Sequence, residues 1–392
     1  MANFPFFSTH FCLLLITLFF KASNAGNYNV LSFGAKGNER TDSTVPFLKA
    51  WASACNSPTP STIYVPKGRF LIKGIVFKGP CKNQITFRID GTVVAPSDYR
   101  ALGNSDSWIL FSKVNKVSVV GGTLDGKGAS YWACKTSGKN CPVGAPSMTF
   151  NWANNIVISG LTSINSRQTH LVINGCNNVV VQNVKAIAPD QSPNTDGIHV
   201  QTSKGVTIIG CTLQTGDDCV SIGPGTYNLF MTNLKCGPGH GVSIGSLGKE
   251  LKEAGVQNIT LKNAIFSGSD NGIRIKTWAR PSKGFVRNIV FDNLIMNNVE
   301  NPIVIDQHYC PDNKGCPRQN SGVQISKVTY RNIRGTSATL EAVSFDCSIT
   351  NPCTDIKLQD IKLLYKNKAA TSYCKNVRGS STGILMPRSC ML

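Results

Sequence analysis

The sequence predicts an all-β protein folded as a right-handed, single-stranded parallel β-helix, and three patterns lead to this fold. One is a seven-residue pattern, such as NIVISGL or NITLKNA, in which β-branched and polar residues alternate as they do in strands. No helical pattern lies between successive copies. An antiparallel sandwich is disfavoured, because it would show turn signals every ~8–12 residues. The copies begin at Lys116, Asn155, Asn178, Gly205, Asn228, Asn258, Asn288, Lys327 and Asp355.

Residues 1–25 indicate a secretory signal peptide. Its apolar run, residues 12–20, is followed by small residues, with Ser23 and Ala25 at the positions expected before a cleavage site. The run is too short to span a bilayer, and no later stretch reaches about 18 apolar residues. We expect a secreted protein without membrane insertion, in which residues 26–392 form a single β-helix domain.

The second pattern is amphipathic and predicts a short helix over residues 43–54, before the repeats. Ser43 or Thr44 would cap it, and Phe47, Leu48, Trp51 and Ala54 would lie on its buried side. A solenoid that ends without a cover exposes apolar core and strand edges, so this helix is expected to cap the first coil.

The third pattern is a set of triplets with aliphatic outer members, such as Val220-Ser221-Ile222. The outer members would point into the core, and stacked coils would align the remaining positions in outward columns. The middle column contains His199, Ser221, Ser243, Arg274 and Val304. Two positions before the triplets lie Asp196, Asp218, His240, Asn271 and Asn301.

Fourteen cysteines remain after Cys12 is removed with the signal peptide, and this even number fits disulfides formed outside the cell. The close pairs Cys134/Cys141, Cys310/Cys316, Cys347/Cys353 and Cys374/Cys390 are candidates, and Cys55 and Cys81 could tie down the capping helix. Cys219 and Cys236 are further candidates, whereas the pairing of Cys176 and Cys211 stays open. Neither CxxC pairs nor clustered histidines indicate a zinc site.

A formal net charge of +19 suits nucleic acid, an anionic membrane surface or an acidic polymer. Composition does not choose among these partners. Secretion argues against nucleic acid.

Six charged or titratable side chains should converge on neighbouring coils. They are Asp196 in NTDG, Asp217 and Asp218 in GDDC, His240 in GHG, and Arg274 and Lys276 in RIK. Adjacent coils lie about 4.8 Å apart, and repulsion among three carboxylates would raise at least one pKa. This produces an acid that stays protonated in mildly acidic water.

The order and spacing of NTDG, GDDC, GHG and RIK resemble the four motifs of polygalacturonases, the family 28 glycoside hydrolases. The resemblance covers nearly all of the chain after the signal peptide. It implies the β-helix fold and hydrolysis, with inversion, of α-1,4 bonds between galacturonic acids in de-esterified pectin, without a metal or other cofactor. On this resemblance we expect a monomer whose partner is an acidic polysaccharide of the cell wall, which the positive net charge would attract.

The resemblance also implies residue roles. Asp217 corresponds to the general acid, Asp196 and Asp218 to the pair that activates water, and His240 to a residue that tunes the acid. Arg274 and Lys276 correspond to groups that grip substrate carboxylates, with Asn194 and Tyr309 as further substrate contacts.

Other functions remain open. A pectate lyase on a similar solenoid would need Ca²⁺, and its motifs are absent. A catalytically silent wall protein would bind pectin through its basic surface, but three aspartates argue against it. Within the resembled family, enzymes that cleave rhamnogalacturonan or xylogalacturonan are possible, and RIK favours plain galacturonan.

The cleavage mode is expected to be exo rather than endo. Residues 126–147 and 309–319 form long inserts with cysteine pairs that could close one end of a groove, and SIGPGT after GDDC resembles the pollen-type exo-acting group. Asn258 begins an N-x-T sequence and is the candidate glycosylation site.

Overall fold

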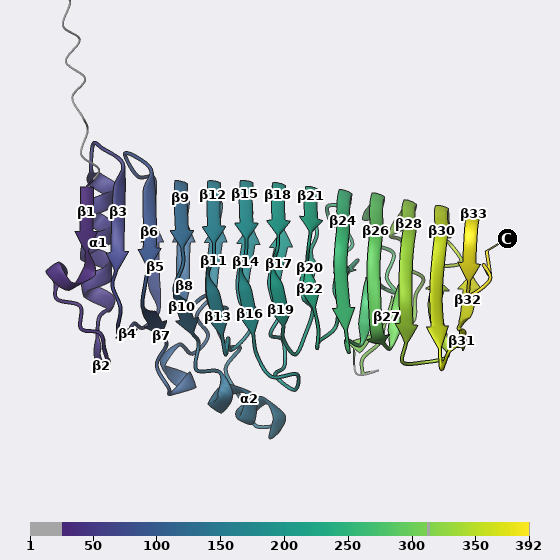
Figure 1. Cartoon of the computed structure of the whole chain (residues 1–392), viewed down its shortest axis with the longest axis horizontal. Helices are drawn as coiled ribbons and strands as arrows, with labels where there is room; N and C mark the ends of the chain where they lie inside the picture. Colours follow the sequence, from purple (N-terminus) through teal and green to yellow (C-terminus); the bar gives the residue numbers. More distant parts are fainter. Residues whose placement is uncertain (1–25, 312–313, 392) are drawn as a thin grey trace, which may run out of the picture.

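The computed structural model describes residues 26–311 and 314–391, which wind into a long solenoid of parallel strands (Figure 1). The predicted all-β, right-handed parallel β-helix is confirmed. The predicted signal peptide lies outside the described residues. No helix in the described part of the chain has the length and apolar character needed to cross a membrane.

One sheet contains a single strand from each successive coil, and all its neighbouring strands are parallel. The predicted triplets lie in these strands. In spatial order the strands are β5 (Ile75–Lys78), β8 (Ile109–Ser112), β11 (Met148–Asn151), β14 (Leu171–Asn174), β17 (Ile198–Gln201), β20 (Val220–Ile222), β23 (Val242–Leu247), β25 (Asn271–Trp278), β27 (Asn301–Tyr309), β29 (Glu341–Asp346) and β32 (Thr371–Lys375).

The other strands form the rest of the coil wall, and each pairs in parallel with the equivalent strand of the next coil. Only the short β31 pairs antiparallel among the described strands. The members are β1 (Gly26–Asn29), β2 (Asn38–Asp42), β3 (Ser61–Val65), β4 (Arg69–Leu71), β6 (Ile85–Ile89), β7 (Thr92–Val94), β9 (Asn115–Val120), β10 (Thr123–Asp125), β12 (Asn154–Ser159), β13 (Thr162–Ile164), β15 (Asn177–Gln182), β16 (Lys185–Ile187), β18 (Lys204–Ile209), β19 (Thr212–Gln214), β21 (Tyr227–Thr232), β22 (Lys235–Cys236), β24 (Val256–Ser267), β26 (Phe285–Val299), β28 (Gln324–Ser337), β30 (Cys353–Tyr365), β31 (Lys368–Ala369) and β33 (Val377–Met386).

The seven-residue repeat marks bends as well as strands. Its first residue adopts a left-handed backbone, with φ of 55° at Asn178, 58° at Asn258 and 58° at Asn288. Asparagine tolerates this conformation better than most residues. The side chains then stack between coils, because Asn258 Nδ2 donates to Asn228 Oδ1 at 2.9 Å and Asn288 Nδ2 donates to Asn258 Oδ1 at 3.1 Å. Asn258 is exposed, and its glycosylation stays a prediction.

Aliphatic residues from all coil walls fill the core, and the outer members of the triplets are fully buried, as expected. At the N-terminal end the core is aromatic. The rings of Phe77 and Phe111 lie 5.0 Å apart, and those of Phe111 and Phe150 stack at 4.7 Å. A continuous core of this kind holds the coils in one register, which positions the columns on the outer surface.

Helix α1 (Thr44–Asn56) covers the first coils, as predicted (Figure 1). Phe47, Trp51 and Ala54 are buried, but Leu48 is 37% exposed, so its predicted burial is wrong. Ala50 faces the core instead, because positions 47, 50, 51 and 54 follow one helical stripe and position 48 falls beside it.

Ser43, one of the two predicted capping residues, is the N-cap residue of α1. The Ser43 hydroxyl makes no cap bond to the helix; it accepts from Lys36 N at 3.1 Å. Asp42 Oδ1 instead accepts from Thr44 N at 2.9 Å. The remaining helical elements are α2 (Ala129–Thr136), which projects from the side of the solenoid, and the 3-10 turns η1 (Val30–Phe33) and η2 (Tyr99–Ala101) (Figure 1).

All twelve candidate cysteines form disulfides. The pairs are Cys55–Cys81, Cys134–Cys141, Cys219–Cys236, Cys310–Cys316, Cys347–Cys353 and Cys374–Cys390. Cys176 and Cys211 are separate buried thiols, and burial raises the pKa of each to about 11. Such thiols stay protonated and unreactive at ordinary pH.

Candidate active site

The register of three neighbouring strands places the predicted catalytic residues together. Ile198 of β17 pairs with Val220 of β20, which pairs with Val242 of β23. Asp196, Asp218 and His240 each lie two residues before these positions, so they lie on successive coils as expected. A hollow of ≈ 660 Å³ opens there. All eight predicted site residues line it: Asn194, Asp196, Asp217, Asp218, His240, Arg274, Lys276 and Tyr309.

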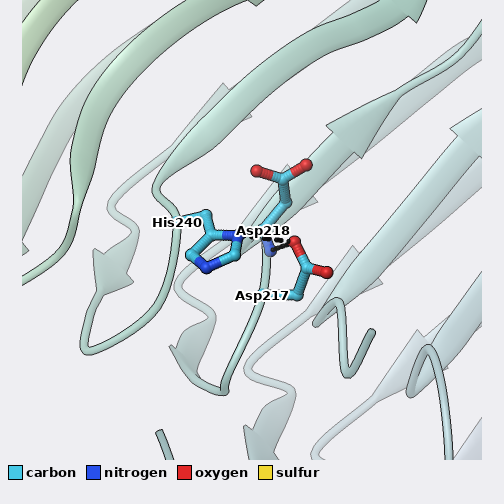
Figure 2. Close-up of side chains that lie close together, drawn as sticks. All are labelled: Asp217, Asp218 and His240. Carbon is cyan, nitrogen blue, oxygen red and sulfur yellow. Dashed lines mark hydrogen bonds and ion pairs between the residues drawn. The ribbon is translucent and has the colours of Figure 1, made fainter. Parts of the chain in front are cut away.

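Asp217 and His240 form a close pair at the edge of this hollow. Figure 2 shows the His240 ring facing the Asp217 carboxylate, with Nδ1 2.8 Å from Oδ1. Burial raises the pKa of Asp217, but the hydrogen bond and charge of His240 outweigh it, and the net pKa lies below the usual value. The same hydrogen bond raises the pKa of His240. The pair therefore favours an ionised carboxylate beside a protonated imidazole.

The two carboxylate oxygens of Asp217 have different partners. Oδ1 also accepts from the backbone N–H of Asp218 at 2.8 Å, whereas Oδ2 meets only the amide of Asn194, at 3.3 Å. Asn194 is exposed and adopts a left-handed backbone with φ 58°. Oδ2 is therefore the oxygen of Asp217 that an incoming group can reach.

Asp218 is buried and receives three donors. Ser243 Oγ donates to Oδ1 at 2.7 Å, Arg274 Nη2 donates to Oδ1 at 3.2 Å, and Lys276 Nζ donates to Oδ2 at 2.8 Å. Lys276 is only 6% exposed, and both cations bind this carboxylate of the protein. The two cations still line the hollow, with the Tyr309 ring centroid 5.3 Å from Lys276 Nζ.

Asp196 is the carboxyl whose pKa is raised, to about 7. Part of its surface faces the hollow, but the surrounding protein removes most of its water. Burial is the largest cause of the raised pKa, followed by the negative charges of Asp217 and Asp218. The sequence predicted one raised pKa among the three aspartates, and the structure assigns it to Asp196 rather than to Asp217.

Ser221 and His199 also line the hollow, and no site role was predicted for them. Ser221 Oγ lies 2.6 Å from Asp196 Oδ2 and 2.7 Å from His199 Nδ1. The signal was present in the sequence, since both belong to the middle column of the triplets. Their importance became apparent only from the side-chain contacts.

Within residues 26–311 and 314–391, two side-chain groups have the spacing of metal ligands. Donor atoms of Asp217, Asp218 and His240 lie within 4.8 Å of one another, as do those of Asp306, His308 and Asp346. In the first group both oxygens of Asp218 already accept hydrogen bonds from side chains of the protein. We therefore assign that group to proton chemistry.

Comparison with known families agrees with this geometry. Residues 55–389 match the model of the family described as Glycosyl hydrolases family 28. The chain belongs to glycosyl hydrolases family 28. Members of this family are expected to break a glycosidic bond, which is a task that paired carboxyl groups perform.

Two relatives and one solved structure extend the comparison with family 28. The chain is 60% identical over 366 residues to a polygalacturonase of Prunus persica, covering 93% of each. It is 42% identical over 372 residues to an exopolygalacturonase of Platanus acerifolia, covering 93% of this chain and 98% of that protein. The structure of an endo-xylogalacturonan hydrolase from Aspergillus tubingensis has a TM-score of 0.80 at 22% identity, covering 91% of this chain and all of the other, and supports the fold.

Proposed function

We propose that this protein is a secreted polygalacturonase that acts as a monomer in the cell wall, with residues 26–392 as its catalytic domain. The observation that carries the proposal is the hollow in which three aspartates, His240 and two cations meet. The names of the Prunus persica and Platanus acerifolia relatives support a galacturonan substrate. The cations beside Tyr309 fit a uronate carboxylate, and the net charge of +19 would attract a polyuronate.

The reaction needs one proton donor and one proton acceptor. Asp217 gives a proton from Oδ2 to the glycosidic oxygen as the bond from that oxygen to the anomeric carbon breaks. Asp196 takes a proton from the water that attacks the anomeric carbon on the opposite face of the ring. Asp218 holds that water in place, and the two cations bound to Asp218 also contact the substrate carboxylate.

The proton must move before the reaction starts. In the free site the raised pKa of Asp196 favours this proton on Asp196, whereas the lowered pKa of Asp217 favours an ionised Asp217 beside His240. A bound glycosidic oxygen accepts but cannot donate, so substrate favours the form in which Asp217 carries hydrogen. One proton therefore passes through solvent from Asp196 to Asp217, and the total charge of the two groups does not change. With Asp217 neutral, the repulsion that adds to the effect of burial on the pKa of Asp196 weakens, and ionised Asp196 serves as the base.

We propose exo cleavage, supported by the charges at one end of the groove. A second hollow of ≈ 520 Å³ begins at Arg274 and is lined by Asp306, Glu341 and Asp346. A polyuronate that continued past Arg274 would meet these acidic side chains. Like charges disfavour that path, so the site best accommodates a chain terminus.

The insert that carries α2, residues 126–147, also supports exo cleavage. Tyr131 and Trp132 of α2 pack on Ala188, which precedes the loop bearing Asn194. Pro311, in the insert with the Cys310–Cys316 disulfide, lines the catalytic hollow beside Tyr309. The Cys310–Cys316 insert therefore borders the site, and the α2 insert packs on the segment that leads to the Asn194 loop.

Product analysis on polygalacturonate tests this proposal. We expect monogalacturonate as the main early product with slow loss of viscosity. Rapid viscosity loss with mixed oligomers would show an endo-acting enzyme. An ultraviolet-absorbing unsaturated product that requires Ca²⁺ would show a lyase, and binding without release of reducing ends would show a silent pectin-binding protein.

A further inference from the structure

Three side chains outside the expected catalytic set form a hydrogen-bonded line that ends on Asp196. Gln201 Oε1 lies 3.2 Å from His199 Nε2, and His199 Nδ1 lies 2.7 Å from Ser221 Oγ. Ser221 Oγ in turn lies 2.6 Å from Asp196 Oδ2. The line crosses two strands, because His199 of β17 pairs directly with Ser221 of β20.

The number of hydrogens in this line limits how it can be arranged. An amide oxygen only accepts, so the contact with Gln201 Oε1 places a hydrogen on His199 Nε2. A neutral imidazole then has a bare Nδ1, which accepts the single hydroxyl hydrogen of Ser221. Ser221 has no hydrogen left for Asp196, and the short contact between them requires a hydrogen on the Asp196 carboxyl.

Ionised Asp196 requires the reverse arrangement. The Ser221 hydrogen must point to the carboxylate, and His199 Nδ1 must carry the hydrogen that Ser221 accepts. Neutral His199 then has a bare Nε2, which accepts from the Gln201 amide nitrogen after that amide makes a half-turn. The net change is the loss of one proton from Asp196 to solvent, with His199 neutral in both arrangements.

We propose that Gln201, His199 and Ser221 are positioning residues that couple the protonation of Asp196 to the tautomer of His199. The proposal deepens the proposed function, because it concerns the group assigned as base there. This hydrogen-bonded line gives each protonation state of Asp196 a complete set of hydrogen bonds. Asp196 can then change charge without leaving the buried Ser221 hydroxyl unpaired.

The surroundings keep His199 in its neutral form. Burial is the largest influence on His199 and lowers its pKa, and the Lys276 charge acts in the same direction, whereas Asp218 and the Gln201 contact raise it. The charged groups that face Asp196 are Asp217, Asp218 and Lys276, of which only Lys276 lowers its pKa. The two-way arrangement therefore depends on a histidine that changes tautomer rather than charge.

Nuclear magnetic resonance of the substrate-free protein tests the coupling without any activity. The ¹³C shift of the Asp196 carboxyl reports its protonation, and the ¹⁵N shifts of His199 report its tautomer. We expect both signals to change with one midpoint in the wild-type protein. A His199 tautomer that stays constant while Asp196 titrates would contradict the proposed coupling, whatever the substrate proves to be.

Ser221→Ala removes the hydroxyl that joins His199 to Asp196, and Ser163→Ala is the matched control. Ser163 and Ser221 are each 3% exposed, and each binds a buried histidine, but Ser163 contacts His170 and no carboxylate. Ser221→Ala should uncouple the two signals and move the alkaline limb of the kcat/KM profile upward by about one pH unit, because ionised Asp196 loses a donor and the pKa of Asp196, which lies above that of Asp217, sets this limb. At a pH below the limb, this is about a tenfold loss of kcat/KM.

The Ser163→Ala control distinguishes a positioning role of Ser221 from a general loss of structure. Ser163→Ala should leave the position of the alkaline limb unchanged. His199→Asn, which keeps a partner for the Ser221 hydroxyl, should recover most of the activity that His199→Leu loses. An equal loss of activity at every pH in Ser221→Ala, together with a lower Tm, would assign Ser221 a merely structural role and contradict the proposal.

Discussion

Lys276 Nζ lies 2.8 Å from Asp218 Oδ2, so the cation expected to grip the substrate is held by a buried carboxylate of the protein. Removing one partner of such a buried pair leaves an uncompensated charge. Lys276 therefore orders the site in the absence of substrate and also offers its charge to a uronate. Changes at this position should affect the chemical step as well as binding.

Lys276→Met keeps the length of the side chain and removes its charge. We expect a loss of about tenfold or more in kcat/KM, with a lower kcat as well as a higher KM, because a charge-assisted contact of roughly 1.5–3 kcal/mol is lost. Lys362→Met is the control, because Lys362 is exposed on β30, a strand outside the sheet that carries the hollow. A higher KM with unchanged kcat would show that Lys276 only binds substrate.

Asp217→Asn should nearly abolish turnover and keep the fold. An amide cannot give a proton to the leaving oxygen, and general acid catalysis contributes about 10² to 10⁴ in rate. Steady-state kinetics on polygalacturonate, with a melting curve for the fold, measures both effects. Activity close to wild type would remove Asp217 from the role of acid.

Asp196→Asn should lower activity but stabilise the protein in alkaline solution. The folded-state pKa of Asp196 is raised to about 7 from its usual 3.8, so between these pH values the folded protein binds more protons than the unfolded chain. The free energy of unfolding then decreases as pH rises through this window. The neutral amide avoids that cost, so Tm should rise at pH 8 and change little near pH 4.

Asp292→Asn provides a comparison of opposite sign. The hydrogen bond from Arg331, 2.9 Å from Asp292 Oδ2, lowers the pKa of Asp292. Its contribution to stability is present above its unfolded pKa and is lost as pH falls through the folded value. This variant should lower Tm at pH 8. Calorimetry of both variants that shows the same sign at pH 8 would contradict the assignment of the raised pKa to Asp196.

The Cys55–Cys81 disulfide should stabilise the capped end of the solenoid. It ties the last turn of α1 to the chain 26 residues later, and a loop of that length corresponds to roughly 3 kcal/mol in the chain-entropy model. Replacing both cysteines by serine should lower the denaturant midpoint more than replacing Cys310 and Cys316, which are only 6 residues apart. Equal shifts would show that chain entropy does not set the difference.

Strand register could be predicted from the sequence, but side-chain pairing could not. The constant offset of Asp196, Asp218 and His240 from their triplets placed them on successive coils, because stacked coils repeat the same backbone. The contact of Lys276 with Asp218 depends on how a long side chain folds back, which spacing does not encode. His199 and Ser221 were visible as one column, yet their hydrogen bonds depend on rotamers.

The most direct test of the proposed mechanism is the anomeric form of the first product. Adjacent coils lie about 4.8 Å apart, less than the separation of about 6.5 to 9.5 Å usual between the carboxyl groups of inverting enzymes, so stereochemistry is the most demanding feature of the account. Proton magnetic resonance of polygalacturonate during the first minutes of digestion measures it. Hydrolysis with inversion of an α bond predicts β-galacturonate ends that later equilibrate. Initial α ends, or an unsaturated product, would contradict the roles assigned to Asp217 and Asp196.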